Sequence, residues 1–397
     1  MVISKDMEVL VAGSSVIRKL FEEGLEMAKV VGKENVYDFS LGNPASPVPD
    51  KVGEEIARIL KEEPLGKVHG YMPNAGFPEV REKVANSLNK RFGMSYDSGD
   101  ILMTVGAAGG MNCVFRAMLN PGEEVIAFAP FFGEYRNYVA NYGGKLVVVP
   151  PDIPEFQLNL EALKSVITEK TRAVIVNNPN NPSGVIYKEE TIKKLDELLA
   201  EAEKKYGRPI YVICDEPYRE LAYGGKTVPY IPKYIRNAIY LYSFSKTLSL
   251  PGERIGYLAL AKEAEGYEEL MPALVCANRI LGYVNAPSLF QLVVGECIEE
   301  PVDLEFYDRN RKLLYEKLTG MGFTLTDPEG AFYFLIKSPV EDEEIFVNKA
   351  KEFHILLVST KSFGLPGYVR LAYCVSYDMI ERSMKAFEEL AKAFQLS

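Results

Sequence analysis

Short apolar runs alternate with longer amphipathic segments through the middle of the chain. The expected strands are 101–105, 125–128, 145–149, 172–176, 210–214 and 238–242. The segments between them include 111–119, 157–167 and 189–204, where apolar residues recur at helical spacing. This alternation predicts an α/β fold whose mostly parallel sheet has helices on both faces. In such sheets ligands bind at the carboxyl ends of the strands.

The flanking segments predict a second lobe. A chain of 397 residues is longer than one core usually supports. Before the sheet, helices are expected over 50–62 and 78–92, and Ser14–Ser15 can cap an earlier one. After it, a long helix over 304–318 leads to strands at 330–336, 355–358 and 368–372 and to a helix that begins near residue 378. This order predicts a smaller α+β lobe.

The stretch from Ser243 to Tyr257 carries the most specific chemistry. Lys246 directly follows a buried strand, and burial lowers the pKa of an amine, which favours Schiff-base chemistry. Eight residues later, Arg254 offers a planar fork that suits a phosphate, and Ser243 and Ser245 can add hydroxyl donors. An amine for an aldehyde and a fork for a phosphate suggest pyridoxal phosphate. The alternative is a solvated loop lysine and an arginine in an ordinary salt bridge.

Other expected strand ends carry residues of related chemistry. A turn of small residues, 106–110, precedes a helix and can bind an anion. Phe131–Phe132 can stack on a planar ring or belong to the core. The Asn-Pro segment 177–184 can aim an amide at a ligand. Asp215 needs a partner, which is either a cation such as a protonated pyridine nitrogen or a backbone cap. Because all lie at strand ends, we expect them to converge with Lys246.

Charge and cysteine content exclude several classes of protein. The net charge is -10 without a Lys/Arg-rich run, which argues against a nucleic-acid partner. The five cysteines are scattered and the two histidines are far apart, so neither a metal site nor a disulfide framework is expected. No signal peptide or apolar stretch of membrane-spanning length is evident, and we expect a cytoplasmic protein without a membrane partner.

Four motifs together resemble one family. They are Asn181-Pro182-Ser183-Gly184, Asp215-Glu216-Pro217-Tyr218, Ser243-Phe244-Ser245-Lys246 with Arg254, and Tyr368-Val369-Arg370-Leu371. In this order the sequence resembles, over nearly its whole length, the fold-type-I pyridoxal-phosphate enzymes of the aspartate-aminotransferase-like family (class I/II aminotransferases). The resemblance implies a large domain, 49–300, with a mostly parallel seven-stranded sheet between helices. It also implies a small α+β domain built from 1–48 and 301–397.

The resemblance implies a role for each motif around the cofactor ring. Lys246 would form a Schiff base with pyridoxal 5'-phosphate and then act as general base. Asp215 would hold the pyridine nitrogen protonated. Asn181 and Tyr218 would donate hydrogen bonds to the ring 3-oxygen. Phe132 would stack on the ring face.

The resemblance also implies sites for phosphate and substrate. The phosphate would be held by Ala107, Ala108, Ser243, Ser245 and Arg254. Tyr71 would reach it from a partner subunit, so a homodimer with shared active sites is expected. Arg370 would bind the substrate α-carboxylate bidentately. Gly42 and Asn181 would lie near the same carboxylate.

The implied reaction is a ping-pong transfer of an amino group between an L-amino acid and a 2-oxo acid. Aspartate, alanine and aromatic donors all remain open. The turn 106–110 lacks a lysine for a side-chain carboxylate, and Arg279 lies one residue out of register, where Ile280 aligns. Ile17, Tyr283 and the loop 361–364 are candidates for shaping the donor pocket.

Two other functions fit the same scaffold. One is a C–S lyase resembling cystathionine β-lyase, which also needs the lysine. The other is a non-catalytic regulatory protein, although the cofactor residues are intact and no DNA-binding extension is seen.

Overall fold

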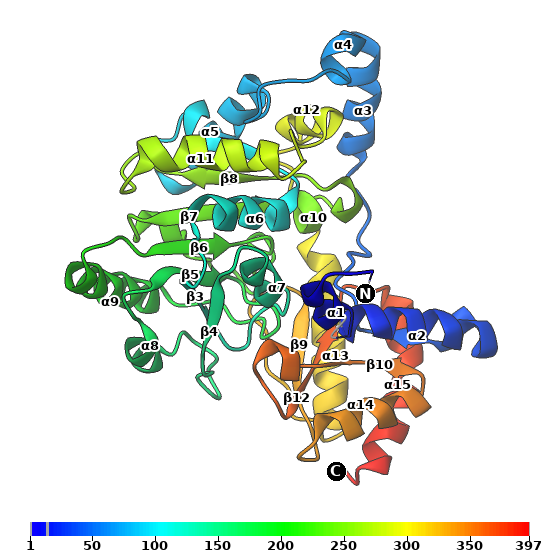
Figure 1. The fold of residues 1–397 in the computed structure, drawn as a ribbon. Helices are drawn as coiled ribbons and strands as arrows, with labels where there is room; N and C mark the ends of the chain where they lie inside the picture. Colours follow the sequence, from blue (N-terminus) through cyan, green and yellow to red (C-terminus); the bar gives the residue numbers. More distant parts are fainter. Residues whose placement is uncertain (1, 13–15, 397) are drawn as a thin grey trace.

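A seven-stranded sheet forms the centre of the computed structural model, which describes residues 2–12 and 16–396 (Figure 1). Its strand order is β2-β8-β7-β6-β5-β3-β4. The strands are β2 (Ile101–Thr104), β3 (Glu124–Phe128), β4 (Lys145–Val149), β5 (Thr171–Asn177), β6 (Tyr211–Asp215), β7 (Ala238–Ser243) and β8 (Gly256–Leu260). β8 pairs antiparallel with β2 and β7, and the remaining pairs are parallel. The predicted mostly parallel sheet is confirmed.

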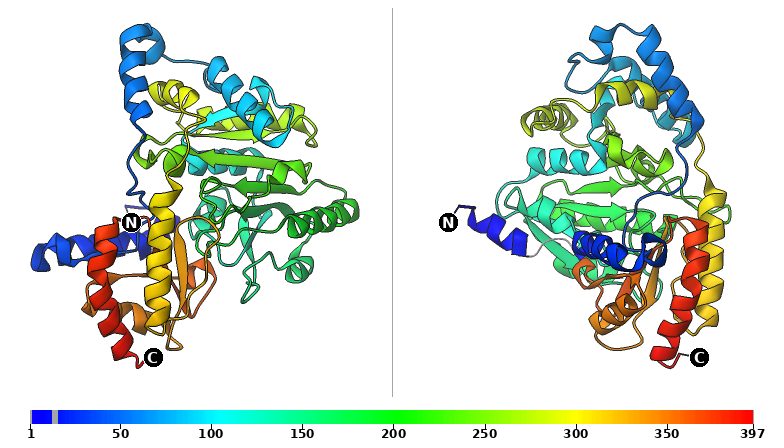
Figure 2. Two further views of the ribbon diagram at one scale, coloured as in Figure 1. Left: turned by 180° about the vertical axis from the view of Figure 1, so that it is seen from behind. Right: turned by 90° about the vertical axis from the view of Figure 1, so that its right-hand side faces the viewer.

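Helices cover both faces of this sheet (Figures 1 and 2). The helices of this lobe are α3 (Asp50–Glu62), α4 (Leu65–Val68), α5 (Pro78–Phe92), α6 (Gly106–Met118), α7 (Tyr135–Ala140), α8 (Leu160–Val166), α9 (Glu189–Tyr206), α10 (Phe244–Thr247), α11 (Tyr267–Ile280) and α12 (Ser288–Glu296). Of these, α3 and α4 lie beyond the edge of the sheet, where α3 packs on α12. Along β6, Val212 and Cys214 face one apolar core, whereas Tyr211 and Ile213 face the other. Burial on both faces explains why these strands read as continuous apolar runs rather than as alternating ones.

The second lobe draws on both ends of the chain. Its elements are α1 (Lys5–Ala12), α2 (Val16–Val31), β1 (Tyr37–Asp38), α13 (Leu304–Gly320), β9 (Tyr333–Lys337), α14 (Glu343–Glu352), β10 (Ile355–Leu356), β11 (Val358–Ser359), β12 (Tyr368–Ala372) and α15 (Tyr377–Ala393). β1 pairs parallel with β10, and β11-β12-β9 forms an antiparallel sheet. Figure 2 shows α13 and α15 side by side. One core unites Phe39 with residues from 307 to 391, and Tyr218 packs against it.

Four of the expected elements differ from the structure, and one is β9, which begins at Tyr333 instead of residue 330. α6 begins at Gly106, so the small-residue turn is already helical. α8 begins only after Asn159, whose Oδ1 accepts a hydrogen bond from the Ala162 amide at 3.1 Å. The expected strand 355–358 is divided, because β10 and β11 pair in different sheets. The expected cap at Ser14–Ser15 lies outside the described residues. None of the described helices is long and apolar enough to cross a membrane.

Candidate active site

One cavity of about 570 Å³ lies at the carboxyl ends of the strands and reaches the second lobe. Every site residue expected from the sequence lines it except Tyr71. These residues are Gly42, Ala107, Ala108, Phe132, Asn181, Asp215, Tyr218, Ser243, Ser245, Lys246, Arg254 and Arg370. The expected convergence of the strand ends is therefore observed.

Lys246 presents its amine from α10, immediately after β7. Its Nζ donates a hydrogen bond to the Gly42 carbonyl oxygen at 2.5 Å. Nζ also lies 5.3 Å from the centroid of the Phe332 ring. Burial lowers the pKa of Lys246 to about 8, and the positive charges of Arg370 and Arg254 also lower it. A substantial fraction of the amine is therefore neutral near physiological pH, as a nucleophile or base requires.

Asp215 ends β6 and is buried, which raises its pKa to about 6. The Tyr135 hydroxyl donates to its Oδ2 at 2.5 Å and partly offsets this rise by stabilising the carboxylate. Tyr135 was not predicted from the sequence. It is the first residue of α7 and lies three positions after Phe132. The cavity thus has a buried carboxylate that suits a cationic ring nitrogen.

An anion cradle lies where α6 begins. Gly106 has φ of 65°, and a Cβ there would lie 2.7 Å from Nη2 of Arg254. The glycine therefore lets the guanidinium approach the helix start, where the first backbone N–H groups have no intrahelical acceptor. Ser243 and Ser245 add two hydroxyls, whose oxygens lie 2.8 Å apart. A guanidinium, helix amides and hydroxyls together suit a phosphate.

Arg370 forms a second anion site from β12 and is only 2% exposed. Its Nη2 donates to the Ser40 carbonyl oxygen at 2.6 Å, and its Nη1 donates to Asn181 Oδ1 at 3.1 Å. Its Nε has no hydrogen-bond partner among the described residues. The guanidinium carbon lies 4.6 Å from the centroid of the Tyr333 ring. Since its recorded hydrogen-bond partners among the described residues are neutral oxygens, this buried cation suits an anionic ligand.

Tyr333 also lines the cavity and was not predicted from the sequence. Its hydroxyl oxygen lies 2.8 Å from that of Tyr218. A Cβ at Gly42 would lie 2.2 Å from the same hydroxyl oxygen. Gly42 is therefore needed for close packing against Tyr333.

The remaining wall of the cavity is mostly apolar. It consists of Phe21, Leu41, Met111, Glu134, Tyr138, Asn177, Pro217 and Pro251. Among the described residues that line the cavity, Lys246, Arg254 and Arg370 are the cations. Glu134 is half-buried, and its Oε2 accepts a hydrogen bond from Asn137 Nδ2 at 2.8 Å. The wall offers no further positive charge for an acidic side chain.

Several residues considered from the sequence lie outside this cavity. Tyr71 is 93% exposed, and Arg279 is exposed at the end of α11. Neither Tyr283 nor the loop 361–364 lines the cavity, although the ring centroid of Phe363 lies 5.4 Å from the Arg370 guanidinium carbon. The side chain of Ile17 lies outside the described residues.

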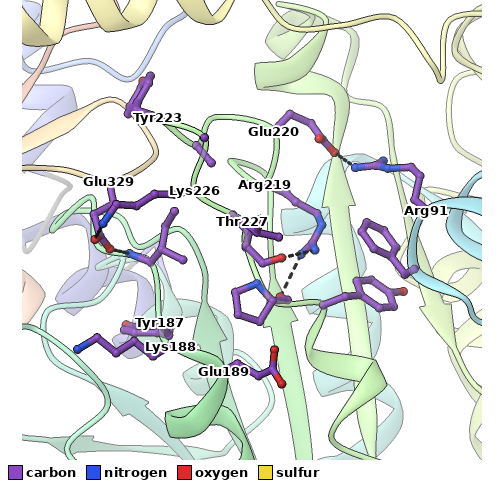
Figure 3. A pocket seen from close by; sticks show the side chains of 18 of the residues that line it. Arg91, Tyr187, Lys188, Glu189, Arg219, Glu220, Tyr223, Lys226, Thr227 and Glu329 are labelled. Atoms are coloured by element: carbon purple, nitrogen blue, oxygen red, sulfur yellow. Dashed lines mark hydrogen bonds and ion pairs between the residues drawn. The ribbon is translucent and has the colours of Figure 1, made fainter.

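A larger groove of about 1380 Å³ lies elsewhere, beside α9 and the start of α13 (Figure 3). Its charged side chains mostly pair with one another or with the backbone. Arg91 lies 2.5 Å from Glu220, Lys226 pairs with Glu329, and Arg219 donates to the Val228 carbonyl oxygen at 2.7 Å. None of the site residues expected from the sequence lines this groove, so it is not the catalytic candidate.

A lysine of lowered pKa, a buried carboxylate and one anion site lie at the strand ends of the large sheet, and a second anion site faces them from β12. Together they define a ligand-binding site of the kind found in α/β proteins. The chain belongs to the family described as aminotransferase class I and II, which matches residues 34–387. It is therefore an aminotransferase, and members of this family use pyridoxal phosphate.

Three similar proteins illustrate the relationship. The probable aspartate/prephenate aminotransferase of Aquifex aeolicus is 32% identical, over 90% of this chain and 92% of its own. Aromatic-amino-acid aminotransferase 2 of Thermococcus litoralis is 29% identical, over 96% and 97%. The crystal structure of an amino transferase from Eubacterium rectale is 45% identical, with a TM-score of 0.96 and 99% of each chain covered. The predicted family and fold are confirmed, and none of these relatives is named a C–S lyase.

Proposed function

We propose that the protein uses pyridoxal 5'-phosphate to transfer an amino group between an L-amino acid and a 2-oxo acid. The observation that carries this proposal is the juxtaposition, in one cavity, of the Lys246 amine with the Asp215 carboxylate and the cradle of Arg254. The amine suits the cofactor aldehyde, the carboxylate suits its ring nitrogen, and the cradle suits its phosphate. When bound, the cofactor supplies an electron-withdrawing ring that stabilises negative charge at the amino-acid Cα.

The residues around the ring orient it and control its charge. Asp215 holds the ring nitrogen protonated, and Phe132 stacks on the ring. Tyr218 donates a hydrogen bond to the ring oxygen. Asn181 uses its Oδ1 to accept from Arg370, which leaves its Nδ2 as the donor to the same oxygen.

The remaining residues anchor the phosphate, bind the substrate and move a proton. Ala107, Ala108, Ser243, Ser245 and Arg254 bind the phosphate. Arg370 binds the α-carboxylate beside Gly42, which fixes the amino acid relative to Lys246. The amine of Lys246 then carries a proton to and from the substrate Cα, because its lowered pKa suits a base near neutral pH.

The amino donor that the cavity favours has an apolar or aromatic side chain. Phe21, Leu41 and Met111 line the wall beyond the assigned groups, and Glu134 would repel a side-chain carboxylate. The three cations of the described wall, Lys246, Arg254 and Arg370, are already assigned to the reacting amine, the phosphate and the α-carboxylate. None of them is therefore left to bind a side-chain carboxylate. The names of the relatives include both aspartate and aromatic enzymes, so either donor class exists among similar proteins.

The working unit is proposed to be a cytoplasmic homodimer with shared sites. Tyr71 is exposed in its own protomer, which supports a role in a partner's phosphate site. The free cysteines among the described residues agree with a reducing compartment. The division into 49–300 and 1–48 with 301–397 is supported by the separate cores of the sheet and of the second lobe.

A single-donor screen tests the proposed reaction. The protein with bound pyridoxal phosphate is mixed with phenylalanine, alanine or aspartate, and the absorbance of the cofactor is followed. Conversion to the aminated cofactor, with recovery on adding a 2-oxo acid, is expected, and phenylalanine should be the best donor. The Lys246→Ala protein should show no conversion. Steady release of pyruvate and ammonia from cystathionine, without conversion by any donor, would favour the C–S lyase instead.

A further inference from the structure

Tyr333 connects two groups that the proposed function uses separately. It begins β9, which faces the cavity from the second lobe. Its hydroxyl oxygen lies 2.8 Å from that of Tyr218, and the two rings meet edge to face with centroids 5.7 Å apart. The face of its ring lies against Arg370, with 4.6 Å between the guanidinium carbon and the ring centroid. One side chain therefore contacts both the phenol and the carboxylate-binding cation.

The direction of the hydrogen bond between the two phenols follows from their protons. Burial raises the pKa of Tyr333 to about 12 and that of Tyr218 well above its ordinary value, so both phenols stay protonated. Each phenol has one proton to donate. If Tyr218 is to donate into the cavity, it must accept from Tyr333.

The packing around Tyr333 favours this direction. A Cβ at Gly42 would lie only 2.2 Å from the Tyr333 hydroxyl oxygen, so the Gly42 backbone closes off that side of the hydroxyl. No acceptor other than Tyr218 is recorded for the Tyr333 hydroxyl among the residues that the structure describes. A buried hydroxyl without an acceptor is costly, so its proton is directed toward Tyr218.

We propose that Tyr333 is a positioning residue for transamination. Its hydroxyl donates to Tyr218 and thereby turns the Tyr218 proton into the cavity, while its ring holds the guanidinium of Arg370 in place. This inference rests on the proposed function, in which Tyr218 donates to the cofactor oxygen and Arg370 binds the substrate carboxylate. Tyr333 thus aligns the cofactor and the substrate relative to each other.

The hydroxyl is tested by Tyr333→Phe, which keeps the ring. The matched control is Tyr307→Phe. Tyr307 is a buried phenol of the same aromatic cluster, with its ring centroid 5.6 Å from that of Phe332, but its hydroxyl bonds to Ser46 at 2.7 Å and it does not line the cavity. The absorbance of the bound cofactor is titrated against pH in both variants, and kcat and KM are measured.

A hydrogen bond to the ring oxygen favours its anionic form, so loss of the oriented Tyr218 proton should raise the midpoint of this titration. We expect Tyr333→Phe to raise it by about one pH unit, a tenfold change in proton affinity. The turnover number should fall by about tenfold, whereas KM for the donor should change by less than about threefold because the ring is kept. Tyr307→Phe should titrate as the parent protein does.

Two further variants distinguish a failure of the proposed function from a failure of the inference about Tyr333. Tyr218→Phe should raise the midpoint by at least as much as Tyr333→Phe does. If Tyr218→Phe does not move it, the role proposed for Tyr218 is wrong, and the inference falls with it. If Tyr218→Phe moves it and Tyr333→Phe does not, only the inference is overturned. Tyr333→Leu removes the ring as well and should raise KM about tenfold above Tyr333→Phe, and equal KM values would reject the part assigned to the ring.

Discussion

Replacing Tyr135 by phenylalanine should raise the pKa of Asp215 and weaken cofactor binding at neutral pH. The Tyr135 hydroxyl donates to Oδ2 of Asp215 at 2.5 Å, and burial raises the pKa of that carboxyl to about 6. A hydrogen bond to an ionised group contributes about 1.5–3 kcal/mol. Since about 1.4 kcal/mol corresponds to one pKa unit, loss of the bond should raise the pKa by about one to two units.

The sign of the pH dependence follows from the form that binds. The ionised carboxylate pairs with a protonated ring nitrogen, so the affinity for the cofactor should rise as the pH passes the pKa of Asp215. In the Tyr135→Phe protein this rise should occur at higher pH. At pH 7 the ionised fraction should fall from about nine-tenths to between about a half and a tenth. Cofactor affinity should therefore be about two- to tenfold weaker at pH 7 and should approach that of the parent protein near pH 9.

The assay is calorimetric titration of the cofactor-free protein with pyridoxal phosphate between pH 5 and pH 9. Titration of the cofactor itself is common to both proteins and cancels in the comparison. Tyr142→Phe is the control, because its hydroxyl bonds to Asn112 Oδ1 at 3.1 Å rather than to Asp215. Identical pH profiles for Tyr135→Phe and Tyr142→Phe would refute the reasoning.

Two other substitutions test the packing and the charge of the cavity. Gly42→Ala places a Cβ 2.2 Å from the Tyr333 hydroxyl oxygen and should destabilise the protein by about 1–3 kcal/mol, with kcat/KM reduced by at least about tenfold. Unchanged thermal unfolding and steady-state kinetics would show that the Tyr333 side chain can move away from the added Cβ without loss of stability or activity. Glu134→Gln removes a negative charge from the wall and should raise kcat/KM for aspartate relative to phenylalanine by about threefold or more. An unchanged ratio in a competition assay would mean that Glu134 does not select the donor.

The sheet and the residues at its strand ends were accessible from the sequence. β5, β6 and β7 lie within a residue of their expected bounds, because strands buried on both faces appear as continuous apolar runs. Asp215 is the last residue of β6, and Lys246 lies in α10, which directly follows β7. Since parallel strands end at one edge of a sheet, their order was enough to predict that these side chains converge.

The side-chain contacts between the two lobes could not be predicted from the sequence in the same way. Tyr218 and Tyr333 are 115 residues apart, and Asn181 and Arg370 are 189 apart. Periodicity assigned Tyr333 to a strand but gave no sign of which partner its hydroxyl would meet. Tyr135 was not singled out in the sequence, because the carboxylate that it contacts comes 80 residues later. Local pattern predicts elements, whereas hydrogen bonds between distant side chains depend on how those elements pack.

The charge of the cavity opposes that of the chain. The protein carries a net charge of -10, yet the described wall places Lys246, Arg254 and Arg370 near one another. Charges on the outer surface are screened over about 8–10 Å at moderate salt, so the nearby cations dominate the local field.

The two guanidiniums add to burial in lowering the pKa of Lys246, and they are also the proposed sites for the two anionic groups of cofactor and substrate. The same arginines thus make the amine reactive and bind the anions, and binding of those anions reduces the repulsion on the amine. Binding of the two anions should therefore raise the pKa of the amine, which makes Lys246 a stronger proton acceptor once the substrate is in place.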